Sequence, residues 1–313
     1  MSEQPLIDVQ NVTVRFPRRR ALASLLRPPP TFRAVAEADL AIPRRTVTAL
    51  VGESGSGKTT LGRTLLRLHE PAEGAILFNG QDITHLREHS LLPIRRRMAL
   101  VFQDPLSSFN PRHTIHTALA TPLRITNAPD IQTRVATALH QVRLPAEAAA
   151  RYPHELSGGQ LQRAALARAL MLSPTFIVAD EAVSKLDVSV RSQILNLLKD
   201  LQSTNEVSFL FITHDLHVAR FIADEVAVMF FGRIIETAPA TTLFRTPRHP
   251  YTQALLATLQ PDSPPPQRAP VDPDAPGCIY QAQCPRRLPR CAERHPPTVI
   301  DAPGHRLACY NPG

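Results

Sequence analysis

One stretch of this 313-residue sequence combines glycines, a lysine and hydroxyl groups at a spacing suited to phosphate chemistry. The residues Gly52-Glu53-Ser54-Gly55-Ser56-Gly57-Lys58-Thr59 fit the pattern G-x-x-x-x-G-K-[ST], and Thr60 follows. The glycines let backbone N–H groups wrap phosphates, and the start of the following helix adds positive potential. Lys58 can neutralise the β and γ oxygens, while the Thr59 hydroxyl can ligate Mg²⁺. The stretch predicts a nucleotide phosphate site.

A second stretch carries paired carboxylates at the end of an apolar strand. Phe176–Ala179 reads as a buried parallel strand, and Asp180 and Glu181 follow it directly. In this position Asp180 is expected to hold Mg²⁺ through water. Glu181 is placed to orient and deprotonate an attacking water molecule. Together with the first stretch, this pair predicts phosphoryl transfer to water.

Between these stretches lies the pentapeptide Leu156-Ser157-Gly158-Gly159-Gln160. Ser157 and the backbone of the two glycines stand before a helix predicted over Leu161–Leu172, an arrangement that suits an anion. The pentapeptide resembles the signature motif of ATP-binding cassette (ABC) transporter subunits, and this resemblance runs nearly end to end. It implies that Ser157 to Gln160 close on the γ-phosphate of an ATP held by the opposite subunit. Two ATP molecules would be sandwiched in a head-to-tail dimer.

The resemblance also implies roles for single residues outside these motifs. Gln103 follows a predicted strand, Met98–Phe102, and matches the Q-loop glutamine that contacts Mg²⁺ and water and relays to the membrane part. His214 matches the switch histidine that contacts the γ-phosphate, and Asp187 matches the D-loop that communicates across the dimer. Phe16 is expected to stack on adenine, with Phe32 as the alternative.

The chain departs from the family pattern at two places. Ala182-Val183-Ser184-Lys185 stand where Pro-Thr-Ser-Ala is usual, and Leu161 stands where close relatives often have Arg. Neither change removes a phosphate or metal ligand. We expect them to affect D-loop geometry or rate.

Strand and helix patterns alternate along the chain and predict an α/β fold with a mainly parallel sheet. The resemblance specifies the class: a P-loop NTPase ABC cassette with a RecA-like core, an antiparallel β subdomain, an α-helical subdomain and a Cys-containing C-terminal extension. The expected strands are Leu6–Arg15, Ala34–Ile42, Thr46–Val51, Ala75–Phe78, Met98–Phe102, Phe176–Ala179 and Ser208–Thr213, with a hairpin at Val226–Glu236. Asn79-Gly80, after the fourth of these strands, is a turn signal. The expected helices are Leu61–Leu68, a helical insert over about 114–150, Leu161–Leu172, Val190–Ser203 and Leu216–Ala223.

Domain organisation follows from a change in composition after residue 260. Seven of the sixteen residues from Pro261 to Pro276 are proline, which predicts an extended linker. We expect an ABC ATPase domain over residues 1–260, with a helical subdomain at about 104–172, the linker over 261–276, and a four-cysteine region over 277–313. Arg18–Pro30, basic and then Pro-rich, reads as a loop or short insertion.

Three further segments resemble the oligopeptide, dipeptide and nickel importers. They are Val101–Arg112, Arg248–Leu256 and the tail from Gly277 to Cys309. The basic loop near Arg18–Arg33 resembles the second, "F"-type ATPase of these systems. The resemblance implies an ATPase that couples energy to uptake of di- or oligopeptides. Implied partners are a second ABC ATPase in a heterodimer, two transmembrane permeases and an extracytoplasmic peptide-binding protein. A nickel importer, or a soluble ABC ATPase such as that of carbon–phosphorus lyase, stays open as an alternative.

Composition limits the other classes of function. Apolar residues make up 43% and charged residues 20%, which is ordinary for a globular chain. The apolar runs are strand-sized, and the N-terminus has neither a basic start nor an apolar stretch for targeting. We therefore expect a protein that is peripheral to the cytoplasmic face of the inner membrane. The net charge is +8, but with 5% aromatic residues and no recognition motif, nucleic-acid binding is not expected.

All four cysteines of the chain, Cys278, Cys284, Cys291 and Cys309, lie in the short Arg/Pro-rich tail. Disulfides are disfavoured in a cytosolic chain, so a metal site or free thiols are the choices. The spacing C-x5-C-x6-C-x17-C lacks the close pairs typical of zinc and misses the bacterial ferredoxin run. The family resemblance implies a [4Fe–4S] cluster, and zinc or free thiols stay open. A metal would serve as a structural staple for a tail with little apolar material.

Overall fold

The computed structural model describes residues 4–17, 31–260, 271–272 and 276–313. The Arg18–Pro30 loop and most of the predicted 261–276 linker lie outside these residues. The chain divides into two compact units. Unit 1 contains Met1–Pro43, Thr48–Leu86 and Thr213–Gly313, and unit 2 contains Arg44–Val47 and Arg87–Ile212.

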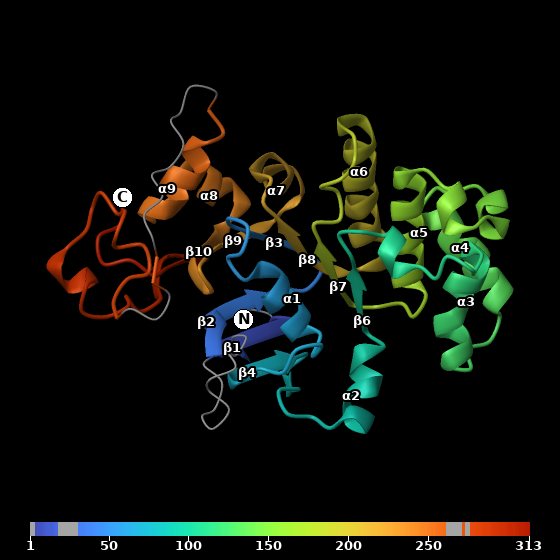
Figure 1. Cartoon of the computed structure of the whole chain (residues 1–313), viewed down its shortest axis with the longest axis horizontal. Coiled ribbons are helices and arrows are strands. Elements are labelled where there is room, and N and C mark those ends of the chain that lie inside the picture. Colours follow the sequence, from blue (N-terminus) through green and yellow to red (C-terminus); the bar gives the residue numbers. More distant parts are fainter. Residues whose placement is uncertain (1–3, 18–30, 261–270, 273–275) are drawn as a thin grey trace, which may run out of the picture. The chain divides into compact units, whose positions relative to one another are not determined.

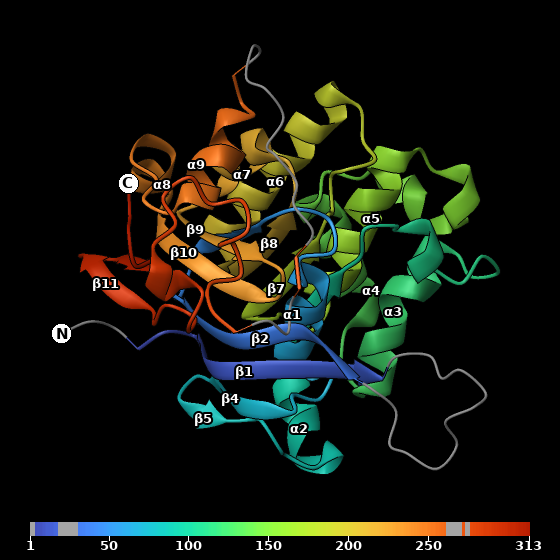
Figure 2. The same ribbon diagram turned by 60° about the vertical axis from the view of Figure 1, so that its left-hand side comes forward.

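Unit 1 contains an antiparallel sheet in the order β2-β1-β4-β5. Its strands are β1 (Ile7–Pro17), β2 (Thr31–Ile42), β4 (Glu73–Phe78) and β5 (Gln81–Asp82). Figure 2 shows β1 and β2 running alongside each other for most of their length. β4 turns into β5 at Asn79 and Gly80, whose φ angles of 55° and 78° suit the Asn-Gly turn that the sequence predicts.

A second group of strands in unit 1 carries the P-loop. β3 (Val47–Val51) pairs in parallel with β9 (Glu225–Phe230), and β10 (Arg233–Pro239) returns antiparallel to β9. All five residues of β3 are buried, as expected for a strand covered on both faces. β3 leads through the P-loop into α1 (Lys58–Leu65). The other helices are α7 (Leu216–Ile222), α8 (Ala240–Arg245) and α9 (Pro250–Ala257).

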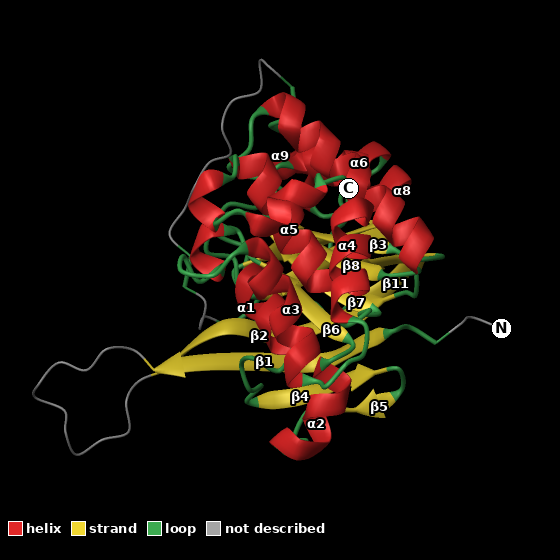
Figure 3. Ribbon diagram, turned by 90° about the vertical axis from the view of Figure 1, so that its right-hand side faces the viewer, coloured by secondary structure: helices red, strands yellow, loops and turns green. Residues whose placement is uncertain are grey.

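Unit 2 combines a parallel sheet with a helical bundle. Its strands, in the order β6-β7-β8, are β6 (Met98–Val101), β7 (Phe176–Asp180) and β8 (Ser208–Thr213). Helices α3 (Ile115–Ile125), α4 (Ile131–Gln141) and α5 (Gly158–Leu170) pack together, as Figures 1 and 3 show. The remaining helices are α2 (Glu88–Arg95) and α6 (Val188–Asn205). Among the described residues, no helix is both long and apolar enough to cross a membrane.

The tail is where the structure departs most from the sequence-based expectation. A tail with little apolar material was predicted, but β11 (Val299–Ala302) and β12 (His305–Leu307) form a hairpin whose second strand pairs with β10. Ile279, Tyr280 and Leu307 are each at most 8% exposed. Ile279 and Tyr280 join the core formed by β3, β9 and α9. The tail does hold few apolar residues, as expected, but they are buried because they pack on a surface supplied by segments distant in sequence.

Candidate functional site: nucleotide-binding motifs in both units

The P-loop in unit 1 is organised around Lys58. This lysine is 5% exposed, and its Nζ donates to the carbonyls of Gly52 at 2.8 Å and Glu53 at 2.7 Å and to Ser56 Oγ at 3.2 Å. Helix α1 begins at Lys58, with no acidic residue in its first turn. The positive end of the helix and the ammonium therefore act in the same place, which suits a phosphate.

Two glycines of the loop occupy positions that no other residue could take without displacing backbone. A Cβ at Gly57 would lie 2.2 Å from the Ala34 carbonyl oxygen, and its φ is +101°. A Cβ at Gly52 would lie 2.1 Å from the Met229 carbonyl oxygen. The loop is thus pressed against β2 and β9, and this close approach fixes its shape.

In unit 2, two predicted site residues that are far apart in sequence lie in contact. Gln103, just beyond β6, donates from Nε2 to Glu181 Oε2 at 2.6 Å. Glu181 has a φ of 47°, an unusual conformation for a residue with a side chain, and its N–H donates to the Ile212 carbonyl. Such strain at the end of a strand is a common feature of functional sites. The expected base is therefore held by the expected Q-loop glutamine.

The other predicted site residues lie at the ends of strands and at the start of a helix, as predicted. Asp180 ends β7 and is only 6% exposed. Asp187 is the residue before α6 and is exposed. His214 follows β8 and is exposed, while Asp215 after it caps α7 by accepting from the N–H groups of His217 and Val218.

The helix at the signature segment, α5, starts at Gly158 and not at Leu161, three residues earlier than predicted. Ser157 Oγ accepts from the Gln160 N–H at 3.3 Å, and Gln160 Oε1 accepts from the Ser157 N–H at 3.0 Å. This reciprocal capping box explains the early start, because it satisfies two backbone donors at the helix end. Ser157 and Gly158 are exposed at this terminus, in a position suited to an anion.

The segment after Gln103 is fixed to the signature helix by Arg168, a residue that sequence reasoning did not identify. Its guanidinium donates to the carbonyl and to the hydroxyl of Ser108, and lies 4.3 Å from the centre of the Phe109 ring. Burial lowers the pKa of Arg168. Because the planar guanidinium donates two hydrogen bonds to Ser108 and stacks on the Phe109 ring, it connects α5 rigidly to the segment after Gln103.

A cavity of about 370 Å³ lies beside this connection, within unit 2. Gln103–Leu106 line it on one side, and the Gln162 side chain, 1% exposed, lines it from α5. Among the described residues, Nε2 of Gln162 has no hydrogen-bond partner. The remaining lining residues are Pro153, His154, Leu156, Gly158, Leu161, Ala182, Lys185 and Leu186. Residues of the Q-loop, signature and D-loop segments therefore line the same cavity.

The two candidates for stacking on adenine are direct neighbours. Phe16 and Phe32 face each other in the register of β1 and β2, and their ring centres are 5.9 Å apart. His69 packs edge-on against Phe16 at 5.3 Å, and burial lowers its pKa. The structure therefore provides one aromatic surface made of both rings.

The four cysteine thiols of the tail influence one another electrostatically. Burial raises the pKa of Cys278 to about 11, and the thiols of Cys291, Cys309 and Cys284 add to the shift. Burial likewise raises the pKa of Cys284 and of Cys309. Each sulfur accepts a backbone hydrogen bond, from Tyr280, Arg286, Leu288 and Asn311 respectively for Cys278, Cys284, Cys291 and Cys309. Among the described residues, however, no three His, Cys, Asp or Glu side chains are grouped closely enough to hold a metal ion.

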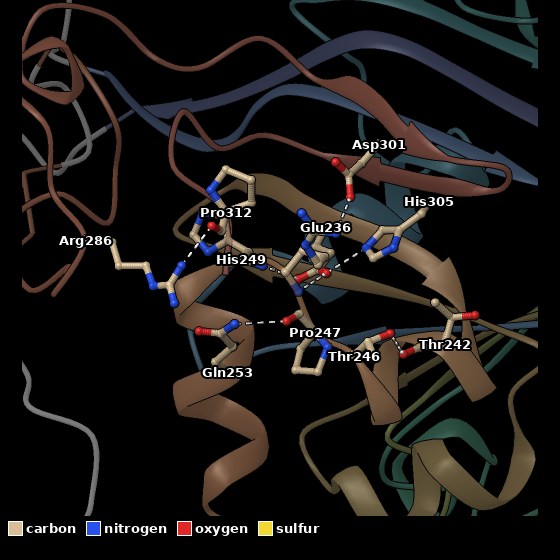
Figure 4. Close-up of polar contacts among 11 residues, drawn as sticks. Glu236, Thr242, Thr246, Pro247, His249, Gln253, Arg286, Asp301, His305 and Pro312 are labelled. Atoms are coloured by element: carbon tan, nitrogen blue, oxygen red, sulfur yellow. Dashed lines mark hydrogen bonds and ion pairs between the residues drawn. The ribbon is translucent and has the colours of Figure 1, made fainter.

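The tail is anchored by a buried carboxylate, Glu236 on β10, which is 1% exposed. It accepts from the backbone N–H groups of Arg248 at 2.7 Å and His249 at 3.0 Å, and it bonds His305 Nε2 at 2.8 Å (Figure 4). Arg248 also pairs with Asp301 of β11 at 3.1 Å. One side chain therefore joins the start of α9 to the tail hairpin.

A P-loop, a capped signature helix and a strand ending in Asp180-Glu181 define an ABC-type ATPase. Comparison with known proteins agrees. Residues 35–184 match the ABC transporter family model, and residues 235–291 match the oligopeptide/dipeptide transporter C-terminal region. The dimeric ATP-binding cassette MJ0796, solved with ADP and Pi, is 27% identical, with a TM-score of 0.65 over 75% of this chain and 98% of that chain.

Curated relatives extend over the whole chain. A putative peptide import ATP-binding protein of Brucella ovis is 42% identical, covering 99% of this chain and 98% of its own length. The oligopeptide transport ATP-binding protein AppF of Bacillus subtilis is 39% identical with the same coverage. The chain belongs to the ABC transporter ATP-binding subunits, in the group that carries the oligopeptide/dipeptide C-terminal region.

Proposed function

We propose that this chain is the ATP-hydrolysing, energy-coupling subunit of an importer of di- or oligopeptides. The observation that carries the proposal is the presence of both parts in one chain: the nucleotide motifs and a C-terminal region of the oligopeptide/dipeptide type over residues 235–291. The tail is integrated into unit 1 through β12 and Glu236 and is not a loose appendage. The two relatives that cover 99% of the chain are named for peptide import and for oligopeptide transport.

We propose the following roles for the residues of the site. The backbone of Gly52–Thr60, together with Lys58, holds the phosphates, and Thr59, Gln103 and Asp180 serve Mg²⁺. Glu181 deprotonates the attacking water, and its hydrogen bond to Gln103 supports this role by holding the carboxylate in place. His214 contacts the γ-phosphate. The Phe16 and Phe32 pair receives adenine.

The remaining site residues would act across an ATPase dimer. In this proposal, Ser157, Gly158 and Gly159 present backbone and hydroxyl donors to the γ-phosphate of ATP on the opposite subunit. Gln160 contributes by capping the helix, and Asp187 communicates between subunits. The favoured dimer is a heterodimer in which this chain is the "F"-type member and a second ABC ATPase is its counterpart.

We further propose that two permeases dock on unit 2 and that an extracytoplasmic binding protein delivers the peptide. The cavity beside Gln103–Leu106 supports this assignment, because it is bordered by the Q-loop and carries the buried amide of Gln162. A permease segment with a carbonyl or carboxylate could pair with this amide. The chain would then be peripheral to the cytoplasmic face of the membrane.

For the tail, we propose that Cys278, Cys284, Cys291 and Cys309 hold a [4Fe–4S] cluster. The donor set has the chemistry of such a group, because four thiols lie in one short tail and each accepts a backbone N–H···S contact. These contacts favour a thiolate, against the burial that raises the pKa of Cys278, Cys284 and Cys309. Binding would require the thiols to draw together from their present positions. The cluster would then serve as a structural staple.

The test is reconstitution in proteoliposomes with the permeases and the second ATPase that copurify with the chain. Labelled di- and oligopeptides should be taken up with ATP and the binding protein, and the Glu181→Gln variant should abolish uptake while still binding ATP. Uptake of Ni²⁺ but not peptide would overturn the assignment in favour of a nickel importer. Recovery of the chain only with soluble enzymes would overturn membrane transport altogether. Iron and sulfide analysis after anaerobic purification, compared with Cys291→Ser, tests the cluster separately.

A further inference from the structure

Three aromatic rings in unit 1 connect the P-loop region with the cysteine-bearing tail. Phe230 ends β9, Tyr251 lies in α9, and Tyr280 lies in the tail between Cys278 and Cys284. Their ring centres are 4.4 Å apart for Phe230 and Tyr251, 5.4 Å for Phe230 and Tyr280, and 5.5 Å for Tyr251 and Tyr280. Each ring is at most 5% exposed. Segments distant in sequence therefore meet in one packed contact.

The Tyr251 hydroxyl touches the P-loop itself. It accepts a hydrogen bond from the backbone N–H of Glu53 at 3.4 Å. The carbonyl of that same peptide unit belongs to Gly52, and it accepts from Lys58 Nζ at 2.8 Å. Because a peptide unit is planar, holding its N–H also fixes the direction of its carbonyl. Tyr251 therefore helps to fix the direction of the Gly52 carbonyl, which in turn helps to position the Lys58 ammonium.

The position of Tyr251 is in turn fixed from two sides. Its own N–H donates to His249 Nδ1 at 3.0 Å, and His249 is held through its N–H by Glu236. On the other side, the Tyr280 ring meets the Tyr251 ring edge-on, with 67° between the planes. Tyr280 stays in place only while the tail is folded, since the Cys278 N–H donates to the Cys291 carbonyl at 2.7 Å.

We propose that Tyr251 is a positioning residue for the nucleotide phosphates, and that Tyr280 makes this positioning depend on the folded tail. A tail that is docked would hold the Tyr251 hydroxyl against the Gly52–Glu53 peptide and keep Lys58 in its binding position. A displaced tail would loosen that peptide and weaken nucleotide binding. The proposal goes beyond peptide import, because it concerns control of nucleotide affinity and holds with or without a metal on the thiols.

The test is titration calorimetry of MgADP with the purified full-length chain, which needs neither a peptide nor a permease. Tyr251→Phe keeps the ring and removes the hydroxyl. One hydrogen bond is worth about 0.5–1.5 kcal/mol, so MgADP should bind about 2- to 12-fold more weakly. Tyr310→Phe is the matched control, because it removes a tail hydroxyl that contacts Arg294 and the His295 carbonyl and not the P-loop. It should bind MgADP like the parent protein.

A double-mutant cycle tests the transmission through Tyr280. Tyr280→Leu should weaken MgADP binding in the parent background and have little further effect in the Tyr251→Phe background. Tyr280→Phe keeps the ring, is the milder change for folding, and should leave the affinity unchanged. Unaltered affinity in Tyr251→Phe would overturn the positioning role. An equal loss from Tyr280→Leu in both backgrounds, or a loss in Tyr280→Phe as large as in Tyr251→Phe, would overturn the transmission. None of these outcomes bears on whether the transporter carries peptides.

Discussion

Replacement of Glu236 by alanine should be among the most destabilising single changes in unit 1. The carboxylate is 1% exposed and serves the N–H groups of Arg248 and His249 and the His305 imidazole. Each buried donor left without an acceptor costs about 1–3 kcal/mol. With partial rehydration of the site, we expect a loss on the order of 3–6 kcal/mol in the free energy of unfolding.

The assay is urea denaturation followed by circular dichroism, together with hydrogen exchange of the β12 amides. In a thermal scan, a loss of this size corresponds to a fall of roughly 5–9 °C in the unfolding midpoint of a 313-residue chain. Protection should be lost first at His305–Leu307, because β12 pairs with β10 at Glu236 itself.

Asp301→Ala is the matched control. It removes a carboxylate from the same tail hairpin, where Asp301 meets Arg248 at 3.1 Å in a partly exposed pair. Such pairs are worth about 0–1 kcal/mol, so stability should change little. If Glu236→Ala stays within about 1 kcal/mol of the parent protein and exchange at β12 is unaltered, the argument from unpaired buried donors is wrong.

Three further predictions concern the site and its supports. Burial lowers the pKa of His249 from 6.5 to about 3, so the unfolded chain binds a proton that the folded chain does not. The free energy of unfolding should therefore fall as the pH drops from about 6.5 toward 3. His249→Asn keeps a side-chain acceptor and should make the free energy of unfolding depend less on pH, as measured by denaturation at several pH values. Glu181→Gln should lower kcat for ATP about 10²- to 10⁴-fold in the reconstituted complex while ATP still binds, and a full-rate variant would show that another group is the base. Gly57→Ala, whose Cβ would meet a backbone carbonyl at 2.2 Å, should abolish MgADP binding, whereas Gly55→Ala, with no atom within 4 Å, should only weaken it.

Local patterns were sufficient for most of the α/β framework. The buried run at β7, the Asn79-Gly80 turn and the hairpin of β9 and β10 depend on residues close in sequence, and they were predicted near their observed bounds. The start of α5 was placed three residues late, because Gly158 and Gly159 are poor helix formers. The capping box of Ser157 and Gln160 outweighs that preference.

The contacts that organise the site depend on long-range packing and could not be read from local pattern. Gln103 and Glu181 are 78 positions apart, and Arg168 reaches Ser108 over 60 positions. Phe16 and Phe32, the two candidates for stacking on adenine, lie side by side only because β1 pairs with β2 in that register.

The sequence by itself determined the chemical class of this protein, because a phosphate loop, a strand followed by paired carboxylates and a signature motif each require particular residues at particular spacings. The tertiary structure decided how the tail is used. Ile279 and Tyr280 are buried because they join a core built from β3, β9, β10 and helices α7 to α9. Glu236 satisfies donors from segments that are otherwise separate. Burial and hydrogen bonding of this kind are properties of segments brought together by folding, so neither composition nor periodicity within the tail could indicate them.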